Sequence, residues 1–186
     1  MSLREQLLDA AIERFAEHGP STSFDVIAAD VGVTKGALYH HFGSKDGLVE
    51  EVYKEAIRRH AKRVTEASAV GDGRTRLLAL VDASARLYAS RTPFYRVLIA
   101  LHLAAATERP ALAEIARRMQ RTQRDFMIGL VRQGQRDGSI DPGLDAEAVG
   151  LTVNAALAGF LTQQLEPPAQ QRRWVAKFRS LLEDLL

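Results

Sequence analysis

The sequence of 186 residues predicts an all-α protein with about nine helices. Apolar residues recur at helical spacing, glycine and proline residues separate the periodic segments, and no run of alternating apolar and polar residues indicates a strand. We expect an N-terminal three-helix domain over residues 1–48, a connecting helix over 49–70 and a second helical domain over 71–186.

The first predicted helix carries apolar residues about 3.6 positions apart and ends before Gly19-Pro20. These residues are Leu3, Leu7, Leu8, Ala11, Ile12 and Phe15. A short second helix follows, and Gly32 after it suits the left-handed backbone at a helix end. Its apolar residues are Phe24, Ile27, Ala28 and Val31.

A third short helix is expected over residues 35–42, with Leu38 and Phe42 on its inner face. Thr34 is placed to cap this helix by accepting a backbone hydrogen bond. The residues left to point outward are Lys35, Tyr39 and His40. Two short helices joined by a tight turn form a helix-turn-helix, whose second helix enters the major groove of DNA.

Six further helices are expected beyond this motif. They cover residues 45–69, 77–89, 93–106, 110–136, 146–164 and the segment from the prolines at 167–168 to 186. Gly71-Asp72-Gly73 ends the first of them and is the best domain boundary, and Asp145 can cap the fifth.

Composition narrows the class of protein. The chain has no cysteine, which excludes disulfides and thiolate metal sites and fits the cytoplasm, where we expect the protein. His18 and His60 have no spaced partner residues, so we expect no metal site and no cofactor. The longest apolar run, Val97 to Ala106, is too short to span a bilayer, and we expect no membrane association.

Net charge does not by itself favour nucleic acid. Residues 1–63 hold nine basic and ten acidic residues, and the whole chain carries only +2. The distribution is more informative, because residues 31–44 contain no acid but do contain Lys35, His40 and His41. We therefore expect modest, salt-sensitive binding to DNA through this local surface.

Residues 19–48 resemble the DNA-binding domain of the tetracycline-repressor (TetR) family. The matching motifs are Thr22-Ser23, Ile27-Ala28, Gly32-Val33-Thr34, Lys35-Gly36, Leu38-Tyr39-His40-His41-Phe42 and Ser44-Lys45-Asp46-Gly47-Leu48. An ordered match of about thirty residues is more specific than helix-turn-helix geometry alone. The chain departs from the family at Val26, at Val31 and at Asp25, where a basic residue is common. Asp25 argues against a phosphate contact there and suits equally a charge in the first turn of its helix.

The resemblance implies a DNA-binding surface of seven residues. These are Ser23, Thr34, Lys35, Gly36, Tyr39, His40 and Lys45. Tyr39 and Lys45 are expected on the phosphate backbone, although Tyr39 could instead pack under the motif and Lys45 could be a solvated side chain. Lys35 and His40 could reach base edges, and Gly36 would allow close approach to the groove.

Two residues of this surface precede helices. Thr34 lies at a helix N-terminus, a position that favours anions, and is expected to contact a phosphate or a base. Ser23 could donate to a phosphate or act purely as a helix cap.

In this family the second domain lines a cavity for a small molecule, and the sequence is compatible with a mainly apolar pocket. The residues expected to line it are Tyr88, Phe94, Leu98, His102, Met119, Phe126 and Met127. Each could equally be a core residue, and His102 in its apolar run is a satisfied core histidine or a ligand contact. A basic stripe over residues 117–136 is a solvated face or a contact for an acidic effector.

The last two helices are amphipathic and could pair with those of a second subunit in a four-helix bundle, the dimer interface of the family. The expected interface residues are Val149, Val153, Leu157, Phe160, Phe178, Leu181, Leu182 and Leu185. Small residues would let another helix approach closely, namely Gly150, Ala155, Ala158 and Gly159. Packing within one subunit is the alternative, and Asn154 could fix the register of a dimer or touch a ligand.

Together these features predict a homodimeric transcriptional regulator, a ligand-responsive repressor of a palindromic operator in double-stranded DNA. Half-sites about 34 Å apart or somewhat more would suit two recognition helices. Three alternatives stay open: an activator, a helix-turn-helix protein that acts mainly through a protein partner, and an enzyme. No catalytic triad, paired-carboxylate motif or phosphate-binding loop favours the enzyme.

Overall fold

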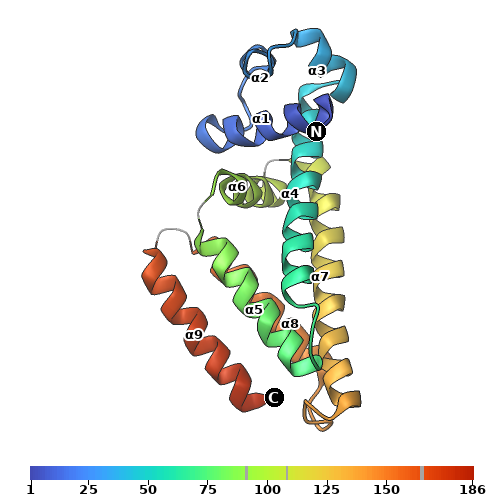
Figure 1. Ribbon diagram of the computed structural model, residues 1–186, viewed down its shortest axis with the longest axis vertical. Coiled ribbons are helices and arrows are strands. Elements are labelled where there is room, and N and C mark those ends of the chain that lie inside the picture. Colours follow the sequence, from blue (N-terminus) through green and yellow to red (C-terminus); the bar gives the residue numbers. More distant parts are fainter. Residues whose placement is uncertain (91, 108, 164–165) are drawn as a thin grey trace. The chain divides into compact units, whose positions relative to one another are not determined.

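The computed structural model describes residues 1–90, 92–107, 109–163 and 166–186. Within these residues the regular structure consists of nine α-helices (Figure 1), so the predicted fold class is confirmed. The helices are α1 (Leu3–His18), α2 (Phe24–Val31), α3 (Lys35–Phe42), α4 (Lys45–Ala67), α5 (Gly73–Ala89), α6 (Pro93–Thr107), α7 (Pro110–Asp137), α8 (Ala146–Thr162) and α9 (Pro168–Leu185). The predicted end of α8, Gln164, lies outside the described residues. None of the described helices is long and apolar enough to cross a membrane.

Several helix ends follow from the caps in the sequence. The Asp145 carboxylate accepts hydrogen bonds from the backbone N–H groups of Glu147 at 2.9 Å and Ala148 at 3.2 Å, so it caps α8 as predicted. Gly32 ends α2 with a left-handed backbone, φ 73°. Thr34 occupies the N-cap position of α3, but its side chain makes no capping hydrogen bond, so that part of the prediction is wrong.

Helix α5 begins at Gly73, earlier than the predicted start at residue 77. The Asp72 carboxylate accepts a hydrogen bond from the backbone N–H of Thr75 at 2.8 Å and caps the helix. The backbone N–H of Gly73 donates to Asp137 Oδ2 at 2.9 Å. A partner from a distant helix therefore satisfies one of the free N–H groups of the first turn.

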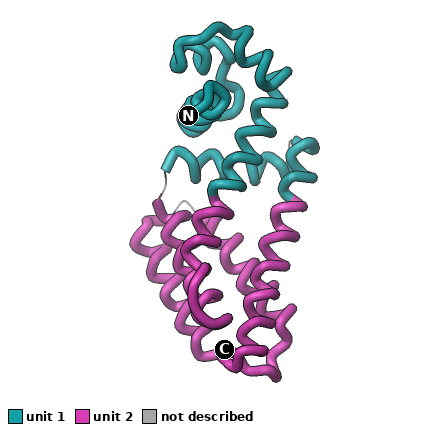
Figure 2. The backbone as a smooth tube through the Cα atoms, turned by 45° about the vertical axis from the view of Figure 1, so that its right-hand side comes forward, with its two compact units in different colours: residues 1–59, 91–116 teal, residues 60–90, 117–186 magenta. Residues whose placement is uncertain are grey.

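The chain divides into two compact units (Figure 2), each made of two segments. One unit holds residues 1–59 and 91–116, and therefore α1, α2, α3, α6 and the beginnings of α4 and α7. The other holds residues 60–90 and 117–186, which include α5, α8, α9 and the remainder of α4 and α7. The predicted domain boundaries at residues 48 and 70 divide the chain by function and not by compactness, and they stay a prediction.

In the first unit, α1 packs against α2 and α6, and α2 packs against α3. Leu7, Ile27 and Leu38 are fully buried and form part of this core. The start of α4 passes close to the end of α3, because a Cβ added to Gly47 would lie only 2.3 Å from the backbone carbonyl oxygen of Phe42. The inner face of α3 is therefore held on a packed scaffold.

In the second unit, α5 packs against both α8 and α9. A Cβ added to Gly150 would lie 2.5 Å from Ile128 Cγ1, so this glycine lets α8 approach α7 closely, as its small size predicted. Val153 and Leu157 are buried one turn apart on α8.

Candidate nucleic-acid interface

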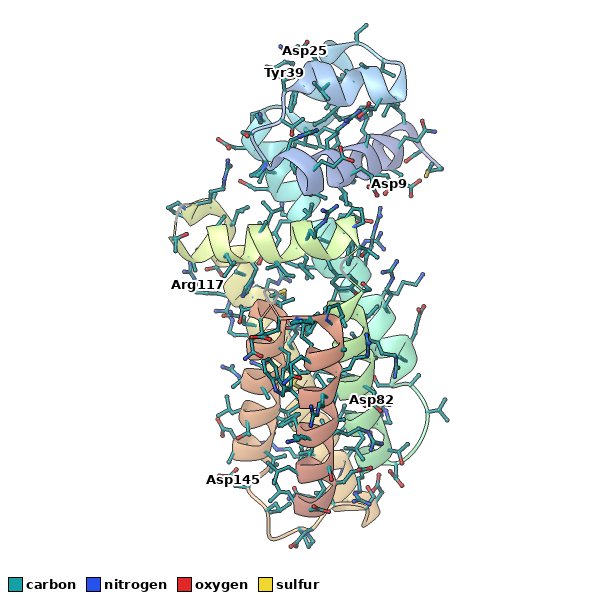
Figure 3. All side chains as sticks on the ribbon, turned by 90° about the vertical axis from the view of Figure 1, so that its left-hand side faces the viewer. Asp9, Asp25, Tyr39, Asp82, Arg117 and Asp145 are labelled. Carbon is teal, nitrogen blue, oxygen red and sulfur yellow. The ribbon has the colours of Figure 1, made fainter. Side chains whose placement is uncertain are left out.

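Helix α3 has a buried face and an exposed face. Leu38 and Phe42 are buried, one helical turn apart, and anchor the helix. The exposed residues of the helix are Lys35, Gly36, Tyr39 and His40. Figure 3 shows Tyr39 and Asp25 on the side of the helix-turn-helix that lies away from α1. These four predicted DNA-binding residues are therefore all accessible on the outer side of α3.

Tyr39 is held in place but not covered. Its ring packs on the buried ring of Phe24 with a centroid distance of 4.9 Å, while 50 % of the residue stays exposed. A ring that is fixed on one side presents its hydroxyl with little loss of side-chain entropy on binding. This arrangement suits a contact to a phosphate.

No contact within the chain requires a glycine at position 36. A Cβ added there would meet only Thr34 Oγ1, at 3.6 Å, which is an ordinary van der Waals distance. By contrast, the backbone contact at Gly47 leaves no room for a side chain. The bare backbone of Gly36 is therefore compatible with a role in admitting an external surface, as predicted.

Lys45 is neither freely solvated nor fully engaged. Its ammonium group donates a hydrogen bond to the backbone carbonyl of Ser21, which ties the start of α4 to the loop before α2. Burial, with a smaller effect from nearby Arg109, lowers the pKa of Lys45. An ammonium has three N–H donors, so two stay available for a phosphate.

Ser23 and Thr34 precede α2 and α3. Ser23 Oγ accepts a hydrogen bond from the backbone N–H of Val26 at 3.4 Å, so the serine caps α2. A hydroxyl that accepts can also donate, and both predicted roles of Ser23 are therefore compatible. The Thr34 side chain does not cap α3, which leaves its hydroxyl uncommitted to the helix end.

The two adjacent histidines of α3 differ in exposure. His40 is exposed, whereas His41 is half-buried, and their rings lie edge to face with centroids 5.4 Å apart. His40 therefore lies on the same surface as Lys35 and Tyr39, where a base contact was predicted.

Sequence reasoning missed one feature of this surface. Lys35 Nζ donates a hydrogen bond to Asp25 Oδ2 at 2.9 Å, and this bond raises the pKa of Lys35. The sequence indicates Asp25 as a departure from the family pattern and as a charge in the first turn of its helix, but not as the partner of Lys35. The only indication of this pair in the sequence is that Asp25 and Lys35 carry opposite charges on either side of a tight turn. The two residues are ten positions apart, so the pair does not follow the i, i+3 or i, i+4 spacing of ion pairs within a helix.

The residues predicted to line an effector pocket divide between the two units. Phe94, Leu98 and His102 belong to the first, and the other four belong to the second. His102 Nδ1 is hydrogen-bonded to Tyr53 Oη at 2.9 Å, and burial lowers the pKa of His102. A hydrogen bond to another residue of the same chain, Tyr53, therefore accounts for a histidine in this apolar run. The four residues of the second unit are Tyr88, Met119, Phe126 and Met127.

Tyr88 has a polar neighbour of its own. Its ring stacks on that of buried His60 at a centroid distance of 5.5 Å. A cleft of about 580 Å³ elsewhere in the second unit is lined mostly by polar and charged side chains, including Arg74, Arg179 and Glu183. It contains none of the predicted effector residues, and the predicted pocket itself stays a prediction.

Four of the eight predicted dimer residues are buried within their own chain. They are Val149, Val153, Leu157 and Leu182. Phe160 and Phe178 are half-buried, and their rings meet between α8 and α9 with centroids 5.9 Å apart. Leu181 and Leu185 are exposed, and the exposed fraction of Leu181 is 67 %. The inward stripe of α8 is thus part of the core of one chain, the alternative that the sequence had left open.

A short helix with an anchored inner face and an exposed outer face of basic, aromatic and glycine residues defines a helix-turn-helix DNA-binding protein. Residues 7–52 match the family model of bacterial regulatory proteins of the tetR family. Residues 73–186 match the model of the C-terminal part of BetI-type transcriptional repressors. The chain therefore belongs to the TetR family and is a DNA-binding transcriptional repressor.

One relative agrees with this assignment, and two solved structures share the fold. The chain is similar to the HTH-type transcriptional repressor KstR2 of Rhodococcus jostii RHA1, with 30% identity over 154 residues that cover 77% of this chain and 71% of the relative. A TetR transcriptional regulator from Chloroflexus aurantiacus J-10-FL shares the fold with a TM-score of 0.82 and 24% identity, covering 95% of this chain and 92% of that one. A TetR transcription regulator from Haloarcula marismortui gives a TM-score of 0.85 at 18% identity, covering 97% and 96%.

Proposed function

We propose that this repressor binds a palindromic operator as a homodimer and that a small molecule controls the binding. The observation that carries the proposal is the exposed face of α3, where Lys35, Gly36, Tyr39 and His40 lie together above an anchored inner face. Such a regulator acts on DNA, which in a bacterium lies in the cytoplasm.

We assign different roles to the residues of this face. Tyr39 and Lys45 would bind phosphates, because each is fixed by a contact within the chain and keeps donors for an external oxygen. Lys35 and His40 would read base edges in the major groove. Gly36 would let the backbone of α3 approach the DNA.

The dimer would use the outer faces of α8 and α9. Leu151, Ala155 and Ala158 are exposed and lie on one side of α8, since they are spaced by four and three positions. Leu181 and Leu185 are exposed one turn apart on α9. Small side chains on one helix and leucines on the other suit a four-helix bundle with a second copy.

The effector would be a mainly apolar small molecule. By linkage, a ligand that weakens DNA binding by some factor must itself be bound more weakly by the DNA-bound protein, by the same factor. A ligand that raises the melting temperature of the protein but leaves its affinity for DNA unchanged would contradict this coupling.

The proposal is tested by selecting binding sites from a random duplex library at physiological salt. We expect a palindrome to be enriched, and we expect Tyr39→Ala to abolish the enrichment. A Lys62→Ala variant, altered at an exposed residue of α4 that belongs to neither proposed surface, serves as a control and should select the same palindrome. A folded wild-type protein that enriches no sequence would refute the proposal.

The exposed leucines of α9 also suit a second candidate, a regulator that acts mainly through a different protein docked on α8 and α9. Sedimentation analysis separates the two, because the homodimer predicts twice the chain mass and the second candidate predicts a monomer.

A further inference from the structure

An acidic side chain lies on the surface that is proposed to meet DNA (Figure 3). Asp25 is in the first turn of α2, and Lys35 is the first residue of α3. The 2.9 Å hydrogen bond between Lys35 Nζ and Asp25 Oδ2 therefore spans the turn between the two helices. A carboxylate at this place repels phosphates, so its presence on a DNA-binding surface requires an explanation.

The ion pair does little for the stability of the fold. The side chain of Asp25 is 65% exposed and that of Lys35 is 47% exposed, and water and salt screen pairs of this kind. The buried side chains of Phe24, Ile27 and Leu38 hold the two helices together instead. The ion pair therefore acts mainly on a ligand that approaches this surface, such as DNA.

A second acid on α2 shows the contrast. Asp30 accepts two hydrogen bonds from the Arg14 guanidinium, at 2.6 and 2.7 Å, and so ties α2 to α1. This bidentate contact joins two helices of the DNA-binding domain that support the recognition helix. Asp25 joins the scaffold to a side chain that extends from the start of the recognition helix.

We propose that Asp25 is a positioning residue that directs Lys35 to a base edge and away from the phosphate backbone. The inference rests on the proposed function. One ammonium N–H of Lys35 is directed to Asp25, which leaves two donors for the O6 and N7 acceptors of a guanine.

The physical basis is that Asp25 and the phosphates of DNA compete for the flexible ammonium group of Lys35. A lysine side chain has four rotatable bonds, and without a fixed partner its ammonium binds any nearby phosphate with release of counterions. Asp25 offsets the charge of Lys35 and restricts the position of its ammonium. The pair thus weakens binding to random DNA and sharpens discrimination at one base pair.

The experiment compares Asp25→Asn, Lys35→Gln and the double variant on three kinds of duplex. These are the selected operator, its full set of single base-pair substitutions, and a random duplex, each titrated at several salt concentrations. Asp125→Asn, in α7, makes the same chemical change at a side chain that is 67% exposed and paired with Arg124, and it is the matched control. Thermal melting confirms that each variant is folded.

We expect Asp25→Asn to bind random DNA more tightly and to steepen its salt dependence by about 0.9 in the log–log slope. Discrimination at one base pair should fall from about tenfold to about threefold. Lys35→Gln should abolish discrimination at the same base pair, and Asp25→Asn should add no further loss there, because both act through one ammonium. Asp125→Asn should behave as wild type.

Two results would overturn the inference while leaving the proposed function intact. One is discrimination that is lost in Lys35→Gln but unchanged in Asp25→Asn. The other is a Lys35→Gln variant that discriminates at every base pair as the wild type does. A wild-type protein that selects no duplex would instead refute the proposed function and this inference with it.

Discussion

Replacing Gly36 with alanine separates DNA binding from stability. The added Cβ would meet only Thr34 Oγ1, at 3.6 Å, so the variant fits the free protein without strain. Alanine favours a helix over glycine by up to about 1 kcal/mol, somewhat less near a helix end. We therefore expect the melting temperature to stay constant or to rise by about 2–4 °C.

The same methyl group would project from the surface of α3 that is proposed to meet DNA. A separation increased by 1–2 Å, a rough estimate for one methyl group, takes a hydrogen bond beyond its useful range. Losing one hydrogen bond to a charged phosphate costs about 1.5–3 kcal/mol, which weakens binding roughly 10- to 150-fold. Fluorescence anisotropy with the labelled operator measures this loss.

Gly129→Ala in α7 is the matched control for the Gly36 variant. Gly129 also lies in a helix, and a Cβ added there would have no neighbour within 4 Å. This variant should gain stability and bind the operator as the wild type does. The reasoning is refuted if Gly36→Ala binds as tightly as the wild type, or if it unfolds at a clearly lower temperature.

Four further predictions follow from the structure. Tyr39→Phe keeps the packing on Phe24 and should leave stability within about 0.5 kcal/mol, while operator affinity falls about tenfold in anisotropy titrations. Gly47→Ala should lower the free energy of unfolding by about 1–3 kcal/mol in urea titrations, because its Cβ would lie 2.3 Å from a carbonyl oxygen. Burial, with a smaller effect from Arg63, lowers the pKa of His60 to about 4, so stability should be complete above pH 6.5 and fall by up to about 3 kcal/mol towards pH 4, a loss that His60→Gln should reduce. Leu181→Glu should halve the mass found by sedimentation at an unchanged helical circular dichroism, since this side chain is 67 % exposed in the single chain.

Some helix ends could be predicted from local caps. Asp145 and Gly32 act on their own or adjacent turns, and both ends agree with the structure. The start of α5 was missed although Asp72 caps it locally, because the flanking glycines Gly71 and Gly73 indicate a break in the helix. A further hydrogen bond at this start goes from Gly73 to Asp137, more than sixty residues away. Contacts between distant residues are not visible in local patterns.

The proposed DNA-facing and dimer surfaces show the same limit of sequence patterns. Periodicity identified the buried stripe of α8 at Val153 and Leu157, but an apolar stripe does not reveal whether its own chain or another chain covers it. The exposed side at Ala155 and Ala158 has weak apolar character and gave only the hint of small size. The pairing of Asp25 required side-chain geometry, which no sequence pattern supplies.

The central claim is that α3 reads DNA in the major groove, and methylation protection on the selected operator tests it most directly. Guanine N7 lies in the major groove and adenine N3 lies in the minor groove, so dimethyl sulfate reports on both. We predict protection of guanine N7 in two half-sites whose centres lie about one helical turn or somewhat more apart, and loss of this protection in Tyr39→Ala. Protection confined to adenine N3, or to a single half-site, would contradict the account.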